Sequence, residues 1–432
     1  MSAPAPSAPV PLGKNRNFRL LWSANALSTL GSQAGFIAVP LLVLSLTGSV
    51  TAFGLVMFIE SAVAVTAGIP AGILVDRLDR RKVMLACDVL RAAVSAVFVI
   101  ALTTGHASMP LIIGVSAVTG ILSSPFGPAA GAVLRTVVPP EQLVSAYSVN
   151  QARNSAITLA GPLIGAALYG VWPVLPFLVD GVSFLASAAC VLFLRAPRSP
   201  RPEAPARRPR LRSDLVTGLR FIRTSPFLRY SVVNAAMMGF ALSAVVITLI
   251  SLHARGGAAP MSTGVLISVS GAGNLLGAVL APRLNRLFSP RRLVLGVCWS
   301  TALLVPAMTL SDALWWTLAL IGVSSIATPA ANIALSAAVT HTVPDHLQGR
   351  VQTTCALLPA LIGPLGPLAA GLLTDRASAS LSLLVFGFLL VALAFFSTFG
   401  RGLHHIPDLR RRPEARPESP VPVARTPKPV RS

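Results

Sequence analysis

The sequence "GILVDRLDRRKVM" at residues 72–84 concentrates charge between two long apolar stretches. It holds six charged side chains, whereas charged residues make up only 11% of the whole chain. The residues on either side, 52–71 and 83–104, are predominantly apolar. A short charged connection between two such segments is typical of a membrane protein, in which the connection lies in water and the segments lie in lipid.

The composition of the 432-residue chain supports a membrane protein. Hydrophobic residues make up 53% of the chain and the mean hydropathy is +0.72, which is more apolar side chain than soluble cores of this size bury. A helix that crosses a bilayer needs about 20 mostly apolar residues. Twelve such stretches are present: 20–46, 52–75, 83–104, 109–135, 143–170, 173–194, 228–252, 261–282, 293–311, 313–340, 350–374 and 379–400. We therefore expect an all-α membrane protein with twelve transmembrane helices.

The net charge of +21 by itself suggests a nucleic-acid-binding protein, but the placement of the charge argues against one. Lys and Arg gather before the first stretch, around 77–82, between 195 and 229, around 283–292 and after 400. The intervening loops at 47–51, 105–108 and 170–173 contain neither residue. This alternation follows the positive-inside rule and predicts that both termini and the central loop are cytoplasmic. We expect the basic segments to meet anionic lipid headgroups rather than nucleic acid.

The chain divides into two similar halves around an Arg- and Pro-rich segment. We predict a cytoplasmic N-terminal segment (1–17), a six-helix bundle (18–194), a cytoplasmic linker with one short surface helix (195–226), a second six-helix bundle (227–400) and a disordered cytoplasmic tail (401–432). "GPAAGAVLRTVVPPEQL" at 127 resembles "TPAANIALSAAVTHTVPDHL" at 328, and "GPLIGAAL" at 161 resembles "GPLAAGLL" at 366. Similar segments separated by nearly the same number of residues favour an internal duplication, which is a known architecture of carriers.

The charged segment between the second and third stretches resembles the signature loop of the major facilitator superfamily. The family pattern is G-x-L-x-D-R-x-G-R-[KR]-[KR], and the matching residues here are Gly72, Leu74, Asp76, Arg77, Arg80, Arg81 and Lys82. Asp79 stands where the family has its internal glycine, which leaves the conformation of the turn open. "CDVLRA" (87–92) and "PFLVDGVSFLAS" (176–187) resemble the branch that holds enterobactin and macrolide exporters. The resemblance implies two pseudo-symmetric six-helix bundles that transport by alternating access.

Asp76 needs a positive partner because it lies at the carboxyl end of its helix, where the helix dipole is already negative. The resemblance implies that this aspartate, with Gly72, Arg77, Arg80, Arg81 and Lys82, latches the two halves when the cytoplasmic side is closed. The alternative is that the basic cluster only fixes the topology.

Charged residues inside the predicted spans are the next candidates, since each is costly in lipid. Glu60 and Arg153 lie at comparable depth, and we expect Glu60 to carry protons or contact substrate with Arg153 as its switch. The alternative for this pair is a static ion pair. Asp88, Arg91 and Asp180 are expected to be structural, with Asp88 and Arg91 paired three residues apart on one helix.

The fifth stretch contains "GPLIGA", which resembles the antiporter motif of exporters at Gly161, Pro162 and Gly165. The proline and the small residues predict a bend against which another helix packs closely. Uncharged polar residues in the spans are candidates for the substrate cavity or for contacts between helices: Asn25, Gln33, Asn150, Asn154, Asn234, Asn274 and Asn332.

These features together predict a proton-coupled exporter of a small molecule, such as a drug, an antibiotic, a siderophore or a secondary metabolite. A facilitator or importer of a small metabolite is the alternative. Motifs of a membrane enzyme or of a nucleotide-binding loop are not found, and the four scattered cysteines suggest neither a disulfide framework nor a metal site. We expect no cofactor or metal and a monomer. Because Arg outnumbers Lys 32 to 3, a GC-rich bacterial genome, and hence a bacterial inner membrane, is expected.

Overall fold

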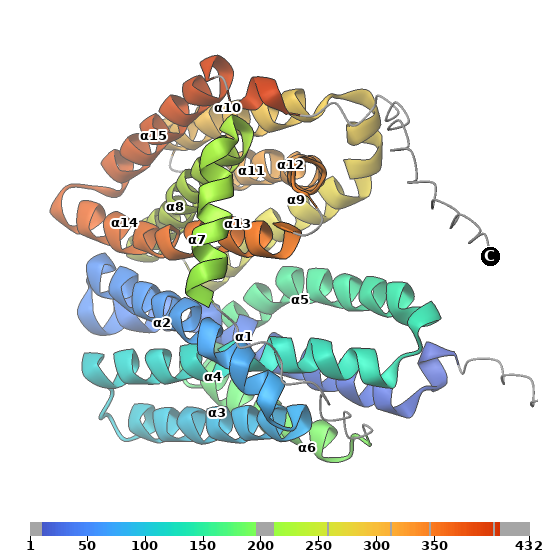
Figure 1. The fold of residues 1–432 in the computed structure, drawn as a ribbon. Coiled ribbons are helices and arrows are strands. Elements are labelled where there is room, and N and C mark those ends of the chain that lie inside the picture. The colour runs from blue at the N-terminus through green and yellow to red at the C-terminus, as the bar shows by residue number, and fades with distance from the viewer. Residues whose placement is uncertain are drawn as a thin grey trace, which may run out of the picture.

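The computed structural model describes residues 11–195, 211–256, 259–311, 313–344, 347–400 and 402–406. Figure 1 shows helices throughout, and the described residues contain no strand. Twelve helical stretches among them are long and apolar enough to cross a membrane. The predicted fold class, an all-α protein with twelve transmembrane spans, is therefore confirmed.

The first half of the chain forms six long helices. They are α1 (Arg16–Thr47), α2 (Val50–Arg77), α3 (Arg80–Thr103), α4 (Met109–Val137), α5 (Leu143–Val171) and α6 (Leu175–Leu192), with single turns of 3-10 helix at Leu12–Lys14 and Pro140–Gln142. Side chains that accept from free backbone amides begin three of these helices, and at the start of α1 Asn15 accepts from the amide of Phe18. Ser49 accepts from the amide of Ala52 at the start of α2, and Asp79 accepts from the amides of Arg81 and Lys82 at the start of α3.

The second half forms eight helices that supply six spans. They are α8 (Pro226–Arg255), α9 (Pro260–Leu287), α10 (Pro290–Ala307), α11 (Leu314–Ile326), α12 (Thr328–Thr342), α13 (Gln348–Ile362), α14 (Leu365–Arg376) and α15 (Ala379–Phe399), with 3-10 turns at Met308–Leu310 and Leu403–His405. The sequence predicts 313–340 and 350–374 as single helices, and the structure divides each in two. Pro329 in the first turn of α12 and Pro364 before α14 explain the breaks, because proline lacks an amide hydrogen and cannot continue the preceding turn.

Helix α7 (Leu211–Thr224) occupies part of the predicted linker and contacts α13. Its Gly218 lies so close to α13 that a Cβ there would approach the Thr354 hydroxyl oxygen to 2.3 Å. Residues 1–10, 196–210, 401 and 407–432 lie outside the described residues, so the predicted tail is described only at 402–406. The domain boundaries given above stay predictions.

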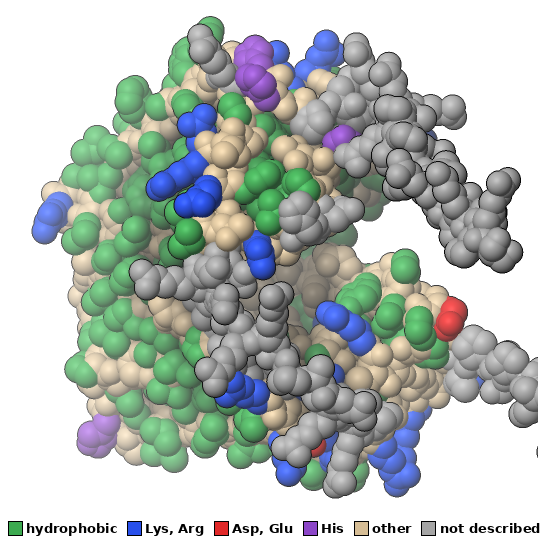
Figure 2. Space-filling view, in the orientation of Figure 1, with side chains coloured by type: hydrophobic (Ala, Val, Ile, Leu, Met, Phe, Trp, Pro, Cys, Tyr) green, Lys and Arg blue, Asp and Glu red, His purple; other side chains and the backbone are tan. Residues whose placement is uncertain are grey.

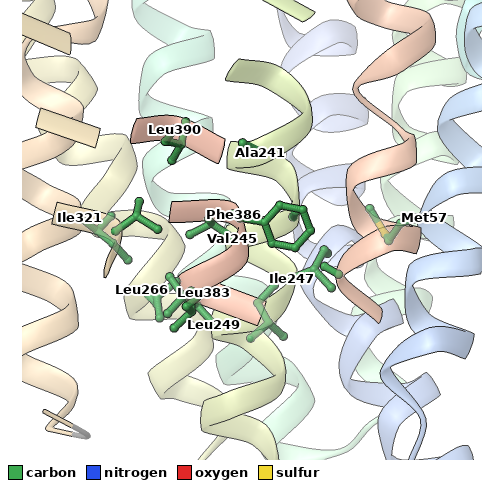
Figure 3. Packing of buried hydrophobic residues seen from close by; sticks show 14 of the residues in the cluster. Met57, Ala241, Val245, Ile247, Leu249, Leu266, Ile321, Leu383, Phe386 and Leu390 are labelled. Atoms are coloured by element: carbon green, nitrogen blue, oxygen red, sulfur yellow. The ribbon is translucent and has the colours of Figure 1, made fainter. Parts of the chain in front are cut away.

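The second half has a core on one face of α8. Ala241, Val245 and Leu249 are spaced four residues apart and therefore share that face, where they join Leu383 and Phe386 of α15 in one buried cluster (Figure 3). The outward faces of many helices are apolar and exposed instead, as hydrophobic side chains over much of the surface show (Figure 2). This inverted pattern fits a protein whose outer solvent is lipid.

The two halves meet along two pairs of helices, α5 with α9 and α2 with α14. Their closest approaches fall near the carboxyl end of α5 and the amino end of α2: a Cβ on Gly54 would lie 2.3 Å from the Pro367 carbonyl oxygen. The other end of α2, which leads into the signature loop, is separated from α13 and α7 by a cleft of about 770 Å³. Figure 2 shows the hollow between the halves. The protein is therefore closed at one end and open at the end that carries the signature loop.

Candidate transport site

The strongest concentration of charge within the spans surrounds a cavity of about 220 Å³ inside the first half. Five helices line it, α1, α2, α3, α4 and α6, and its charged lining residues are Glu60, Arg91 and Asp180. Serine and threonine side chains supply most of the remaining polar lining: Ser32, Ser95, Ser116, Thr119 and Ser123. Helices α3 and α6 lie at the edge of the half, yet Arg91 and Asp180 reach inward from them to this cavity.

Arg91 is held by groups that carry no charge. Its guanidinium donates to the hydroxyl oxygens of Ser28, at 3.3 Å, and Ser32, at 2.9 Å. It also lies over the ring of Phe184, 3.9 Å from the centroid, which is a favourable cation–π contact. Only 6% of Arg91 is exposed. The charge is thus fixed in place beside the cavity without a direct ion pair.

The carboxylates near Arg91 are incompletely satisfied. Asp88 is fully buried and one of its oxygens, Oδ2, accepts from the Ser187 hydroxyl at 2.6 Å. Its Oδ1 and the Oδ1 of Asp180 are buried without a hydrogen-bond partner. The predicted Asp88–Arg91 pair is not formed: Asp88 bonds α6, whereas Arg91 bonds α1. Spacing on one helix therefore gave the wrong partner.

Arg153 belongs to a different cluster and is not among the residues that line this cavity. It donates to the side-chain oxygens of Asn150, at 3.1 Å, and Asn154, at 2.9 Å, and to the backbone oxygen of Trp22 on α1, at 3.2 Å. The structure thus brings together three of the predicted polar residues, with Trp22 as a partner that the sequence did not indicate. It does not place Arg153 as the partner of Glu60 in this conformation.

The other predicted amides are dispersed. Gln33 lines the charged cavity, Asn25 donates to the Leu21 carbonyl of its own helix, and buried Asn234 accepts from the Cys298 thiol. Asn274 donates to the Ser270 carbonyl, and it and Asn332 are exposed. Among the residues described, no group of His, Cys, Asp and Glu could hold a metal ion.

The signature loop is ordered by contacts within the first half. Asp79, which departs from the family pattern, has an ordinary extended backbone and caps α3, so no glycine is needed at this turn. Arg81 donates to the carbonyl oxygens of Val191, at 3.0 Å, and Leu192, the last residues of α6. A cation there adds a donor to the last carbonyls of α6 and complements the helix dipole. The side chain of Asp76 lies outside what the structure describes.

Replacing Arg81 by alanine should therefore loosen the junction between α3 and α6. We expect a loss of about 1–2 kcal/mol, because hydrogen bonds from a charged donor to two carbonyls disappear. Thermal unfolding of the detergent-purified protein should occur a few degrees lower. Lys82→Ala, in the same loop but exposed, is the matched control. Equal melting of the two variants would contradict the proposed capping role.

The antiporter-like residues on α5 lie where α1, α5 and α9 meet. A Cβ on Gly161 would lie 2.5 Å from the Gln33 Cβ, and one on Gly165 would lie 2.4 Å from the Ala34 carbonyl oxygen. On the other side of α5, the Pro162 carbonyl oxygen would lie 2.8 Å from a Cβ on Gly264 of α9. The motif thus allows close packing within the first half and, through Pro162, at the closed contact between the halves.

Twelve spans in two halves, joined at one end and parted at the other, with a charged cavity inside the membrane, define a membrane transporter of the alternating-access class. Family comparison agrees. The family model described as Major Facilitator Superfamily matches residues 21–351 and 235–432, and the chain belongs to this family. It is therefore a multi-pass membrane transporter of the secondary type and not an enzyme.

The similar proteins are transporters as well. The multidrug efflux pump Tap of Mycolicibacterium fortuitum is 26% identical over 89% of this chain and 95% of its own. Macrolide efflux protein A of Streptococcus pyogenes is 26% identical over 42% of this chain and 45% of its own. Among solved structures, a bacterial homologue of the lysosomal transporter Spinster, inward-facing and unoccupied, has a TM-score of 0.70 at 16% identity, covering 89% of this chain and 96% of that one.

Proposed function

We propose that the protein exports small molecules from the cytoplasm in exchange for protons. The observation that carries this proposal is the cavity in the first half, which Glu60 and Asp180 line together with Arg91. Neither carboxylate forms an ion pair with Arg91, so neither is neutralised by direct contact with it. Such a carboxylate is a candidate to load and release a proton as its surroundings change.

The physical basis of the coupling is a competition between two effects. Apolar surroundings disfavour a charged carboxylate, whereas a nearby arginine or entering water favours it. A movement of α1, which holds Arg91 through Ser28 and Ser32, would change the distance between the guanidinium and the carboxylates. In this proposal Arg91 takes the role that the sequence suggested for Arg153.

The orientation follows from the charge distribution. We propose that the signature loop faces the cytoplasm together with both termini, in the inner membrane of a bacterium, and that the protein acts as a monomer. The conformation described above is then open to the cytoplasm. Fusions of a reporter enzyme to the two termini test this arrangement, which fails if they fall on opposite sides of the membrane.

The proposed substrates are apolar molecules of drug size, including macrolides. Support comes from the names of the relatives and from the cleft at the open end, whose volume is that of drug-binding pockets. Its lining is mostly small or apolar: Ala64, Val65, Gly68, Leu215, Ala356, Leu357 and Ala360, with Gly349, Arg350 and Thr353.

Purified protein in liposomes tests the proposal directly. An outward-directed proton gradient, set up across liposomes that hold the protein inside out and have an acidic interior, should drive accumulation of a labelled macrolide or a fluorescent drug. Collapse of the gradient with an ionophore should release the accumulated substrate. Equilibration at the same final level with and without the gradient would identify a facilitator and overturn the proposed coupling.

A further inference from the structure

The closed end of the transporter contains an inter-half contact around Asp375, the second-last residue of α14. Its Oδ1 accepts from the Val50 amide at 3.1 Å, and its Oδ2 accepts from the Thr51 amide at 2.8 Å and from the Ser49 hydroxyl at 2.7 Å. These groups are the amino end of α2, whose first amides have no partner within the helix. A carboxylate of the second half therefore caps a helix of the first.

Arg255, the last residue of α8, completes the contact. One of its nitrogens, Nη2, donates to Asp375 Oδ1 at 2.5 Å and to the Gly48 carbonyl oxygen at 2.6 Å. Gly48 ends α1 with a φ of 65°, a left-handed conformation that glycine adopts readily. The turn between α1 and α2 is thus held by Asp375 through its amides and by Arg255 through its carbonyl.

These interactions depend on the closed arrangement. Asp375 lies at the carboxyl end of its own helix, where the dipole of α14 disfavours a negative charge. The amino end of α2 supplies the opposite dipole only while the halves touch. The side chains of Arg255 and Asp375 are 43% and 21% exposed, so water can form hydrogen bonds with both groups when the halves part.

Helix backbones approach closely beside this contact. A Cβ on Gly371 of α14 would lie 2.5 Å from the Val50 carbonyl oxygen, one helical turn from Asp375. At the opposite end of α2, a Cβ on Gly72 would meet nothing within 4 Å. The two ends of α2 therefore differ: the end bound by Asp375 is packed, and the end that carries the signature loop is not.

From this arrangement we propose that Asp375, Arg255 and the α1–α2 turn (Thr47–Thr51), here called the α2 latch, hold the transporter closed at the end opposite the signature loop. The latch must open once in each transport cycle, and this role rests on the proposed function by alternating access. Asp375 and Arg255 are then positioning residues: they touch no substrate but set the balance between the two conformations. Asp76, at the other end of α2, would be their counterpart in the opposite conformation.

Distance measurements between spin labels test the latch without any substrate. In a chain whose four cysteines are replaced, a pair at Val171 and Met261 reports the closed end of α5 and α9, and a pair at Val144 and Leu287 reports the open end of the same helices. All four positions are exposed. Wild-type latch residues should give a short distance for the first pair and a long one for the second.

Asp375→Asn and Arg255→Gln should each increase the fraction of molecules parted at the Val171–Met261 end about tenfold or more, as expected for loss of charge-assisted hydrogen bonds. The Val144–Leu287 distance should shorten in parallel. Arg376→Gln, which removes an exposed charge beside Asp375, is the matched control and should leave both distributions unchanged. Gel filtration confirms that each variant is folded. If Asp375→Asn does not fold, Arg255→Gln tests the latch alone, because Arg255 is exposed.

Unchanged distributions in Arg255→Gln and Asp375→Asn would overturn the latch, whatever the transport assays show. Because no gradient or substrate is present, the outcome is separate from the proposed function. A shift in the distances together with failure of proton-driven uptake would keep the latch and remove proton-coupled export.

Discussion

Glu60→Gln should lose proton-driven accumulation of substrate while retaining exchange of labelled for unlabelled substrate. Glutamine keeps nearly the size and hydrogen-bonding capacity of glutamic acid but cannot release a proton, so the cavity keeps its shape and loses its titratable group. We expect gradient-driven accumulation in proteoliposomes to fall at least about tenfold, whereas exchange at equal pH on both sides changes little. The separation of these two activities is what a proton carrier predicts and what a packing residue does not.

Two further variants interpret this result. Glu141→Gln removes an exposed carboxylate on the turn before α5, outside the cavity, and should behave as wild type. Asp180→Asn removes the second carboxylate of the cavity. If this variant loses gradient-driven accumulation and Glu60→Gln retains it, the proton site lies on α6. Uphill transport by Glu60→Gln with an unchanged pH profile would end the assignment to Glu60.

The fold was predictable because its signals are strong in sequence. Segments of about 20 apolar residues and alternating basic loops are required by the thickness and the polarity of the bilayer, whatever the details of packing. The breaks at Pro329 and Pro364 were missed, since hydropathy continues unchanged across them. Prolines within α1, α2 and α5 cause no such break, so the presence of a proline does not by itself predict where a helix divides.

The sequence identified the charged residues of the site, but it assigned structural roles to Arg91 and Asp180 and the switch role to Arg153, which does not line the cavity. Any charge within a span is conspicuous, which is why Glu60, Arg91 and Asp180 could be named. Which of them share a cavity depends on the rotation of each helix, and this is poorly encoded when lipid-facing and buried faces are both apolar. A usable signal was present in Ser28 and Ser32, whose spacing puts them on one face of α1, where Arg91 donates to both.

The α2 latch shows a different limit of sequence reasoning. Arg255 and Asp375 stand near the ends of spans, where charged residues are ordinary and suggest only topology. Their pairing joins helices 120 residues apart, and the other partners of Asp375 are two backbone amides and a serine hydroxyl. Only the assembled structure brings these groups together.

Gly264→Leu is expected to block closure between α5 and α9 and to reduce transport at least about tenfold. Even a Cβ at this position would lie 2.6 Å from the Ala166 Cβ and 2.8 Å from the Pro162 carbonyl oxygen, so a leucine cannot fit while the two helices touch. Overpacking of this kind costs about 1–3 kcal/mol, which is enough to shift two conformations of similar stability strongly towards the one in which the helices are parted. The Val171–Met261 spin-label distance should lengthen in the same variant. Gly296→Leu on α10 is the matched control, because a Cβ there meets nothing within 4 Å. Wild-type transport by Gly264→Leu would show that the cycle does not require this contact to close, whereas loss in both variants would point to impaired insertion or folding.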